Sequence, residues 1–197
     1  MRRSKTQKMV GVAMLAAIGY LLMFLAFPVI PLFPYMKVDF SDIPILIGTY
    51  LFGPIAGITT AFLRSVIHFV TTGGDVANLI GDVTSFVASV AFVLPVYFIT
   101  KKSRSKFSLI SGLAVGVLSL TVVMSVMNYF VTLPLYLKVM NFDVGMAYTK
   151  YIVTVVVPFN LIKGAIISTV FLGVHAKLLP WLSKKEGIVG HQTKGAN

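Results

Sequence analysis

Residues 43–73 read IPILIGTYLFGPIAGITTAFLRSVIHFVTTG, an apolar stretch of 31 residues. As one α-helix it would be about 46 Å long, whereas the hydrocarbon core of a bilayer is roughly 30 Å thick. Gly53-Pro54 lies inside the stretch, and proline removes a backbone donor and clashes with the preceding turn. The stretch is therefore predicted to form either one kinked, tilted helix or two helices that meet at Gly53-Pro54.

The composition places this stretch in a membrane protein. Of the 197 residues, 57% are apolar and only 12% are charged, whereas roughly a quarter of the residues in a soluble domain are charged. A mean hydropathy of +0.90 is too high for the large exposed surface of a small soluble chain. Further apolar stretches cover residues 9–27, 76–100, 108–137 and 151–179. We therefore expect an all-α, multi-pass protein of the cell membrane, surrounded by the lipid bilayer.

Clusters of Lys and Arg predict how the helices cross the membrane. They lie within residues 2–8, 101–106 and 177–194, and such clusters usually face the cytoplasm. If all three do, an even number of crossings separates them. Division at Gly53-Pro54 then gives a bundle of six transmembrane helices with both termini cytoplasmic. The same asymmetry accounts for the formal net charge of +11 without a nucleic-acid partner.

The short second helix and the polar C-terminal tail need separate predictions. The second helix, from Ile43 to Phe52, would span only about 15 Å, so it must be extended, tilted or partly buried by protein. Residues 1–182 are expected to form a single six-helix membrane domain. The polar C-terminal tail, residues 183–197, is expected to be disordered.

Polar side chains recur at helical spacing within four of the expected helices. Because a polar group in lipid is costly, such stripes are expected to face the inside of the bundle. The stripes are Thr60, Arg64 and His68; Asn78, Asp82, Ser85 and Ser89; Thr121, Ser125, Asn128, Thr132 and Tyr136; and Asn160 with Lys163. Serine and threonine are also common in ordinary helix packing, which stays an alternative for them.

Lys163 is the most costly of these residues, because it lies near the middle of its helix. Two interpretations are open: an ion pair with Asp82 or another buried carboxylate, and a donor to a polar ligand. Together with Asn128 and Asn160, it would match the imide edge of a neutral heterocycle. Arg64 has two similar options, a structural pair with Asp82 or contact with a partner.

Two further segments have both a structural and a functional interpretation. Residues 27–42 contain three prolines and three phenylalanines, so they predict a stiff loop that either anchors the chain at the membrane interface or covers an open bundle as a lid. Ala13 and Ala17, four residues apart in the first helix, allow another helix to approach closely. That helix belongs either to the same chain or to a partner.

The sequence contains none of the common catalytic motifs. It has no Gly-x-x-x-x-Gly-Lys-Ser/Thr loop, no Gly-x-Ser-x-Gly motif and no His-Glu-x-x-His motif. It also has no cysteine, and His68, His175 and His191 are too far apart for a local metal site. We therefore expect no catalytic residues, no metal and no cofactor, and do not expect an enzyme.

Four motifs carry a resemblance that covers nearly the whole chain in order. They are DFSDIP from Asp39, FGPIAG from Phe52, NYFVTLPLY from Asn128 and PFNLIKG from Pro158. Together they resemble the riboflavin-specific S component of bacterial energy-coupling factor (ECF) transporters. The resemblance implies six transmembrane helices, a riboflavin site open to the outside, and a lid formed by the loop after the first helix.

The resemblance also implies roles for individual residues. Asn128, Asn160 and Lys163 match residues that contact the flavin ring in that family. The loop residues implied in the substrate site are Met36, Lys37, Val38 and Asp39. Ala13 and Ala17 match a motif that docks on the transmembrane T subunit. A pair of ATPase subunits would complete the complex and use ATP, and riboflavin would be the transported substrate rather than a cofactor.

A transporter that works alone is the main alternative. Protons moving through Asp82, Arg64 and Lys163 would then drive uptake of a small aromatic solute. Inverted repeats, which are common in secondary transporters, are not visible in this sequence. The preferred hypothesis is therefore a subunit that captures riboflavin outside and releases it inside with the T subunit and the ATPases.

Overall fold

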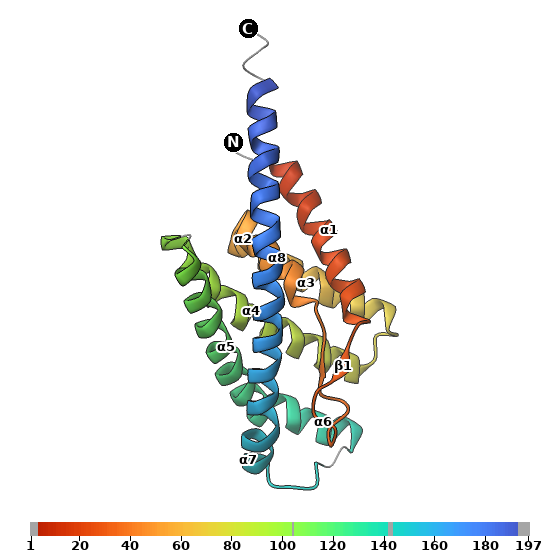
Figure 1. Ribbon diagram of the computed structural model, residues 1–197. Helices are drawn as coiled ribbons and strands as arrows, with labels where there is room; N and C mark the ends of the chain where they lie inside the picture. Colours follow the sequence, from red (N-terminus) through yellow and green to blue (C-terminus); the bar gives the residue numbers. More distant parts are fainter. Residues whose placement is uncertain (1–3, 104, 142–143, 193–197) are drawn as a thin grey trace.

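The chain folds into a bundle of long helices with one short β-hairpin (Figure 1). The computed structural model describes residues 4–103, 105–141 and 144–192. The elements, with η1 and η2 as π-helical turns, are α1 (Lys5–Met23), β1 (Phe27–Pro28), β2 (Lys37–Val38), α2 (Asp42–Phe52), α3 (Pro54–Thr71), α4 (Val76–Lys102), α5 (Lys106–Met127), η1 (Asn128–Thr132), α6 (Leu133–Met140), α7 (Tyr148–Tyr151), η2 (Ile152–Val156) and α8 (Val157–Gln192). The predicted helical fold is thus confirmed, with the two antiparallel strands as an addition.

The ends of the helices follow from local chemistry. Ser4, Asp75 and Ser105 each accept a hydrogen bond from a backbone N–H in the first turn of the helix that follows. After α2, Gly53 has a φ of 96°, a conformation that favours glycine. Pro54 then begins α3, where its missing N–H costs nothing. The apolar stretch therefore forms two helices rather than one kinked helix.

Length and composition support a multi-pass membrane fold. Among the described residues, five helical segments are long and apolar enough to cross a membrane: Lys5–Met23, Pro54–Thr71, Val76–Lys101, Lys106–Met140 and Tyr148–Lys177. The sixth expected helix, α2, has only 11 residues, fewer than the roughly 20 that a crossing requires. Most of its side chains are buried by the rest of the protein. A sixth crossing and cytoplasmic termini stay predictions.

Two π-helical turns interrupt the long helices beside the cavity described below. η1 connects α5 to α6, and η2 connects α7 to α8. The spacing of the polar stripe from Thr121 to Tyr136 predicts an unbroken α-helix, so η1 corrects that expectation. Turns of this kind are frequent at functional sites, because they change the direction of the side chains that follow.

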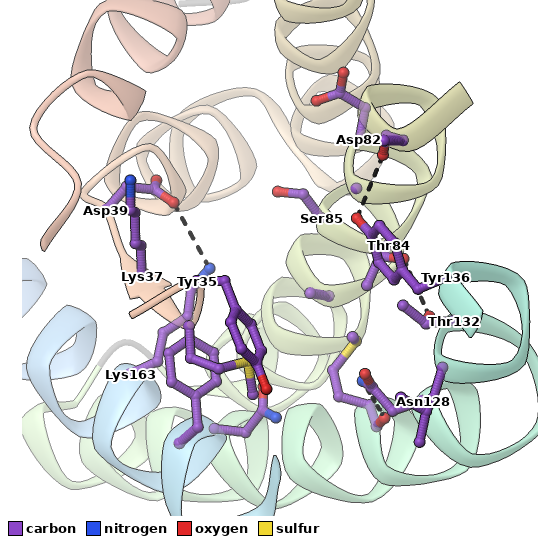
Figure 2. Close-up of a pocket in the computed structure, with 18 of the residues that line it drawn as sticks. Tyr35, Lys37, Asp39, Asp82, Thr84, Ser85, Asn128, Thr132, Tyr136 and Lys163 are labelled. Atoms are coloured by element: carbon purple, nitrogen blue, oxygen red, sulfur yellow. Dashed lines mark hydrogen bonds and ion pairs between the residues drawn. The ribbon is translucent and has the colours of Figure 1, made fainter. Parts of the chain in front are cut away.

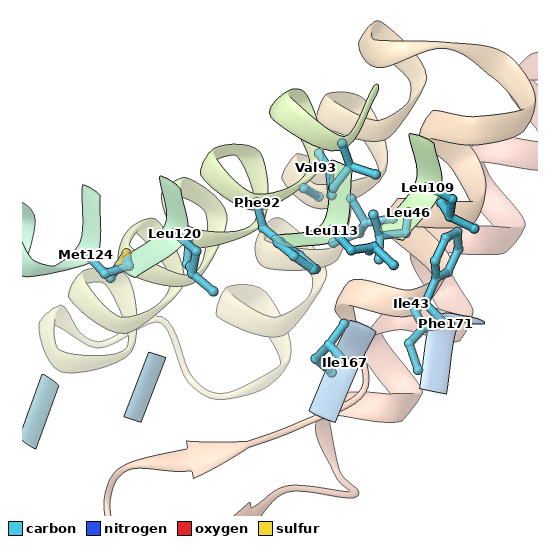
Figure 3. Close-up of a cluster of buried hydrophobic side chains, with 14 residues drawn as sticks. Ile43, Leu46, Phe92, Val93, Leu109, Leu113, Leu120, Met124, Ile167 and Phe171 are labelled. Atoms are coloured by element: carbon cyan, nitrogen blue, oxygen red, sulfur yellow. The ribbon is translucent and has the colours of Figure 1, made fainter. Parts of the chain in front are cut away.

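The larger of two buried apolar clusters lies where α2, α4, α5 and α8 meet (Figure 3). Leu46, Phe92, Leu120 and Ile167 are among its fully buried members. The close approach of α5 to α4 depends on Gly116, where a Cβ atom would lie 2.8 Å from the carbonyl oxygen of Phe92. This cluster fixes the helices around which the cavity forms.

The smaller cluster attaches the loop between α1 and α2 to the bundle. Ile30, Phe33 and Met36 of this loop pack against buried side chains on α6, α7 and η2. Figure 1 shows the hairpin at the same end of the bundle as α6 and α7, whereas both chain termini lie toward the opposite end. The loop is therefore packed over one end of the bundle.

The last helix is longer than the sequence predicts. α8 continues to Gln192, so residues 183–192 are helical where the polar composition predicts a disordered tail. Lys184, Lys185 and Glu186 are good helix formers, and no proline follows Pro180, which explains why the helix continues. The rest of the expected tail, residues 193–197, lies outside the described residues.

Candidate ligand-binding site

A cavity of about 560 Å³ lies between the loop that follows α1 and the helices from α3 to α8. Its volume is typical of a site for a small molecule. Figure 2 shows Lys37, Asp39 and Lys163 on one side of the cavity and Asp82 and Tyr136 on the other. Its walls thus come from segments that are far apart in the sequence.

Most of the substrate-site residues expected from the sequence line this cavity. They are Met36, Lys37, Asp39, Asn128, Asn160 and Lys163. Val38 is not among the lining residues: it is fully buried and pairs with Phe27 in the hairpin. Successive side chains of a strand point to opposite faces, so Lys37 and Asp39 face the cavity while Val38 packs away from it.

The two asparagines share one arrangement. Nδ2 of Asn128 donates to the carbonyl of Met124 at 2.8 Å, and Nδ2 of Asn160 donates to the carbonyl of Val156 at 2.8 Å. Each bond ties the side chain to the preceding turn of its own chain segment. Each asparagine then keeps its side-chain oxygen as an acceptor, and its second N–H as a donor, for a ligand.

Lys163 is paired with carboxylates from the loop and from α2. Its Nζ lies 3.3 Å from Oδ2 of Asp42 and 4.0 Å from Oδ2 of Asp39. The ion-pair interpretation is therefore confirmed, with these two carboxylates in place of Asp82. Because the lysine also lines the cavity and its ammonium group has three N–H donors, the ion pair leaves it able to donate to a ligand.

Arg64 extends this pairing into a buried ionic network. The side chain is fully buried, and Nη1 lies 3.6 Å from Oδ1 of Asp42. Its guanidinium also donates to the hydroxyls of Ser41 and Ser85. Of the two options for Arg64, the structural ion pair is formed, but with Asp42, the first residue of α2, in place of Asp82. Opposite charges and hydrogen bonds offset the cost of burying the guanidinium.

Asp82 instead meets His68. Its Oδ1 lies 2.8 Å from Nδ1 of His68, and both residues line the cavity. Both belong to polar stripes that predict inward-facing positions, and that prediction is confirmed. The spacing of a stripe does not reveal which acid meets which base, because the partners lie on different helices.

Sequence reasoning misses the aromatic part of the lining. Tyr35, Tyr151 and Phe159 also face the cavity, and planar side chains suit a flat, partly apolar ligand. Phe159 precedes Asn160 directly, which is the one signal that the sequence offers for it. Tyr151 has the appearance of an ordinary tyrosine at a membrane interface, so its role is visible only in the structure.

Ala13 and Ala17 lie on the outer surface of the bundle. Both are exposed, whereas Val12, Ala16 and Gly19 on the other face of α1 are buried. Packing within the chain is therefore not the role of Ala13 and Ala17. Their small side chains present a face that a helix from outside the chain is able to approach closely.

Comparisons with known proteins connect this bundle to a family. The model described as the ECF transporter, substrate-specific component, matches residues 7–175. This chain belongs to that family. It is therefore an S component, a multi-pass membrane protein with a role in transport rather than catalysis. The family supports the preferred hypothesis and not the self-sufficient secondary transporter.

Similar proteins match nearly the full length of this S component. Riboflavin transporter RibU of Staphylococcus aureus is 38% identical over 181 residues, which cover 91% of this chain and 94% of the relative. Riboflavin transporter FmnP of Bacillus subtilis is 36% identical over 183 residues, which cover 92% of this chain and 96% of the relative. A solved S component of a bacterial ECF transporter aligns with a TM-score of 0.78 at 37% identity, covering 91% of this chain and 99% of that chain.

Proposed function

We propose that this S component captures riboflavin outside the cell and releases it inside as the substrate-binding subunit of an ATP-driven ECF transporter. The observation that carries the proposal is the convergence of Asn128, Asn160 and Lys163 on one cavity. The relatives named riboflavin transporters support the choice of ligand. The protein would bind and release its substrate without covalent chemistry.

The groups in the cavity match the edge of a flavin ring. The imide edge of riboflavin has one N–H donor between two carbonyl acceptors. The side-chain oxygen of one asparagine would accept from the N–H, and the remaining amide N–H of the other and the ammonium group of Lys163 would donate to the two carbonyls. Tyr151 and Phe159 would provide apolar contact with the ring.

The loop between α1 and α2 would act as a lid. Met36, Lys37 and Asp39 would contact the ligand from this loop. The loop packs on the smaller apolar cluster, and Asp39 approaches Lys163 to 4.0 Å. The loop would open for entry of the ligand and restore these contacts when it closes.

The proposal requires the cavity to open to the outside. We place both termini in the cytoplasm, because they lie toward the end of the bundle opposite the hairpin (Figure 1) and the basic clusters then follow the positive-inside rule. In this topology α2 is a short sixth crossing that is surrounded mainly by protein. The cavity then lies in the outer half of the bundle.

Partner subunits would supply the energy. Ala13 and Ala17 would dock on the T subunit, and two ATPase subunits would hydrolyse ATP. The exposure of these alanines on α1 supports this role, because small side chains allow close helix–helix approach in lipid. The S component itself would need no nucleotide.

Titration of riboflavin with the purified S component tests the binding step. We expect flavin fluorescence to be quenched with equimolar saturation, and a folded protein that leaves the fluorescence unchanged would overturn the proposal. Uptake into proteoliposomes tests the coupling. We expect uptake only with the partner subunits and ATP, whereas uptake by the chain alone under a proton gradient would support a secondary transporter.

A further inference from the structure

The two sides of the cavity differ in chemistry. Lys163 and Asp39 lie on one side, and Asp82 lies on α4 across the cavity (Figure 2). The groups proposed to hold the flavin ring include Lys163 but not Asp82. The α4 side therefore has a polar group facing the cavity with no role in binding the ring.

Asp82 is deeply buried and only partly satisfied. The residue is 4% exposed, and its Oδ1 meets Nδ1 of His68 at 2.8 Å. Its Oδ2 is buried and has no hydrogen-bond partner within the part of the chain that the structure describes. An acceptor in this state is costly unless a donor reaches it.

Two hydroxyl groups that line the cavity together with Asp82 are bonded to backbone carbonyls. Tyr136 donates to the carbonyl of Ala77 at 3.3 Å, and Thr84 donates to the carbonyl of Ile80 at 2.6 Å. Neither donates to Asp82. A molecule that occupies the cavity is able to supply a donor for the second oxygen of Asp82.

The charge of Asp82 is also poorly balanced. Arg64 and Lys163 are engaged with Asp42 in the ionic network. Among the described residues, His68 is the ionisable group found paired with Asp82. In a poorly hydrated cavity, charge interactions are stronger than in water. This wall should therefore attract a hydroxyl donor and repel an anion.

We propose that Asp82 determines specificity by accepting a hydrogen bond from a hydroxyl of the ligand's ribityl chain and by disfavouring a phosphate on that chain. The inference rests on the proposed function. A ring held by Asn128, Asn160 and Lys163 would direct its ribityl chain into the remaining volume, which α4 bounds. Riboflavin carries hydroxyls along this chain, whereas FMN ends it with a phosphate.

Three flavins distinguish protein contacts with the flavin ring from protein contacts with the ribityl chain. Riboflavin, FMN and lumiflavin, which carries a methyl group in place of the ribityl chain, are titrated by fluorescence quenching. In Asp82→Ala we expect the Kd for riboflavin to rise about 10- to 100-fold, the range for a lost hydrogen bond to a charged group. The Kd for lumiflavin should not change.

Asp82→Asn tests the charge separately. The amide keeps an acceptor oxygen but removes the negative charge, so we expect the ratio of the FMN Kd to the riboflavin Kd to fall about tenfold. Asp75→Asn is the matched control on the same helix. Asp75 caps α4 outside the cavity lining, and asparagine caps a helix equally well, so all three affinities should stay unchanged.

Ratios of Kd values within one variant do not depend on how much of the protein folds. The inference is overturned if Asp82→Ala weakens the binding of lumiflavin as much as the binding of riboflavin. It is also overturned if Asp82→Asn leaves the ratio of the FMN Kd to the riboflavin Kd unchanged. The proposed function itself would be contradicted by a different result, in which the folded, unsubstituted protein binds neither riboflavin nor lumiflavin.

Discussion

Two buried polar regions of this S component differ in how completely the oxygens of their carboxylates are satisfied. Oδ1 of Asp42 accepts a hydrogen bond from Ser89 at 2.5 Å and faces Arg64, while Oδ2 faces Lys163 at 3.3 Å. Asp82, across the cavity, has one oxygen with no partner among the described residues. The difference teaches that burial alone does not mark a binding residue. Ion pairs and a hydrogen bond hold both oxygens of Asp42 within the fold, whereas the oxygen of Asp82 without a partner belongs to a residue that lines the cavity.

Lys163 belongs to both regions. It is held by Asp42 and Asp39 and also lines the cavity, so its substitution would change stability and binding together. Residues that belong to one region alone give sharper tests. Arg64 serves the network, and Asn128 and Asn160 serve the cavity.

The largest expected effect is on stability and comes from Arg64→Met. Asp42 would then keep Lys163 but lose a buried cation, and removal of one partner from a buried ion pair typically costs about 3–5 kcal/mol. We expect a loss of that size in the free energy of unfolding, measured by denaturant titration in mixed micelles. Lys138→Met removes an exposed cation from α6 and should change stability by less than about 1 kcal/mol. Equal stability of the two variants would contradict the structural role of the network.

The sequence predicts much of the fold because membrane helices depend on local properties. Gly53-Pro54 marks the boundary of α2 and α3, and the polar stripes identify the inner faces of several helices. The π-helical turn at Asn128 is not predictable from apolar length. Nor is the helix over residues 183–192, because a polar composition at the end of a chain is compatible with either a helix or disorder.

The candidate site is predictable only in part. Asn128, Asn160 and Lys163 stand out because amide and ammonium groups are costly in lipid. The partner of Lys163 is not predictable in the same way, because Asp42 lies at the start of a short helix rather than in a recognised stripe. Tyr151 escapes prediction as well, since an aromatic side chain carries no such cost.

The next largest effect should be on binding alone. We expect Asn128→Leu or Asn160→Leu to weaken riboflavin binding by about 1–3 kcal/mol, because a polar group of the ligand loses its hydrogen-bond partner, while the unfolding free energy changes little. Thr169→Val is the control, since it removes a similar hydrogen bond to the preceding turn on an exposed face of α8. Unchanged affinity in both asparagine variants, by fluorescence titration, would refute their place in the site.

A smaller effect is expected from the loop that closes the cavity. The Phe33 ring lies 5.8 Å from the rings of Tyr35 and Tyr151, both of which line the cavity. Phe33→Ala should loosen the loop and speed riboflavin release about tenfold, with less change in the association rate. Leu32→Ala is a matched control, because Leu32 is 81% exposed in the same loop. Stopped-flow release that is equally fast in both variants would show that the loop is only an interface anchor.

Substitutions on the exposed face of α1 should have the smallest effect on the stability and riboflavin affinity of the S component itself. They should nevertheless abolish uptake by the assembled transporter. Replacing both Ala13 and Ala17 with Trp enlarges an exposed face, so riboflavin affinity and stability should stay unchanged while close packing against the T subunit is lost. Ala16→Trp provides the contrast, because Ala16 is 1% exposed and a large side chain there should disturb the bundle itself. Co-purification with the partner subunits, flavin titration and ATP-dependent uptake on the same variants distinguish the two faces. Normal assembly and uptake by the Ala13→Trp/Ala17→Trp variant would show that the partner docks elsewhere.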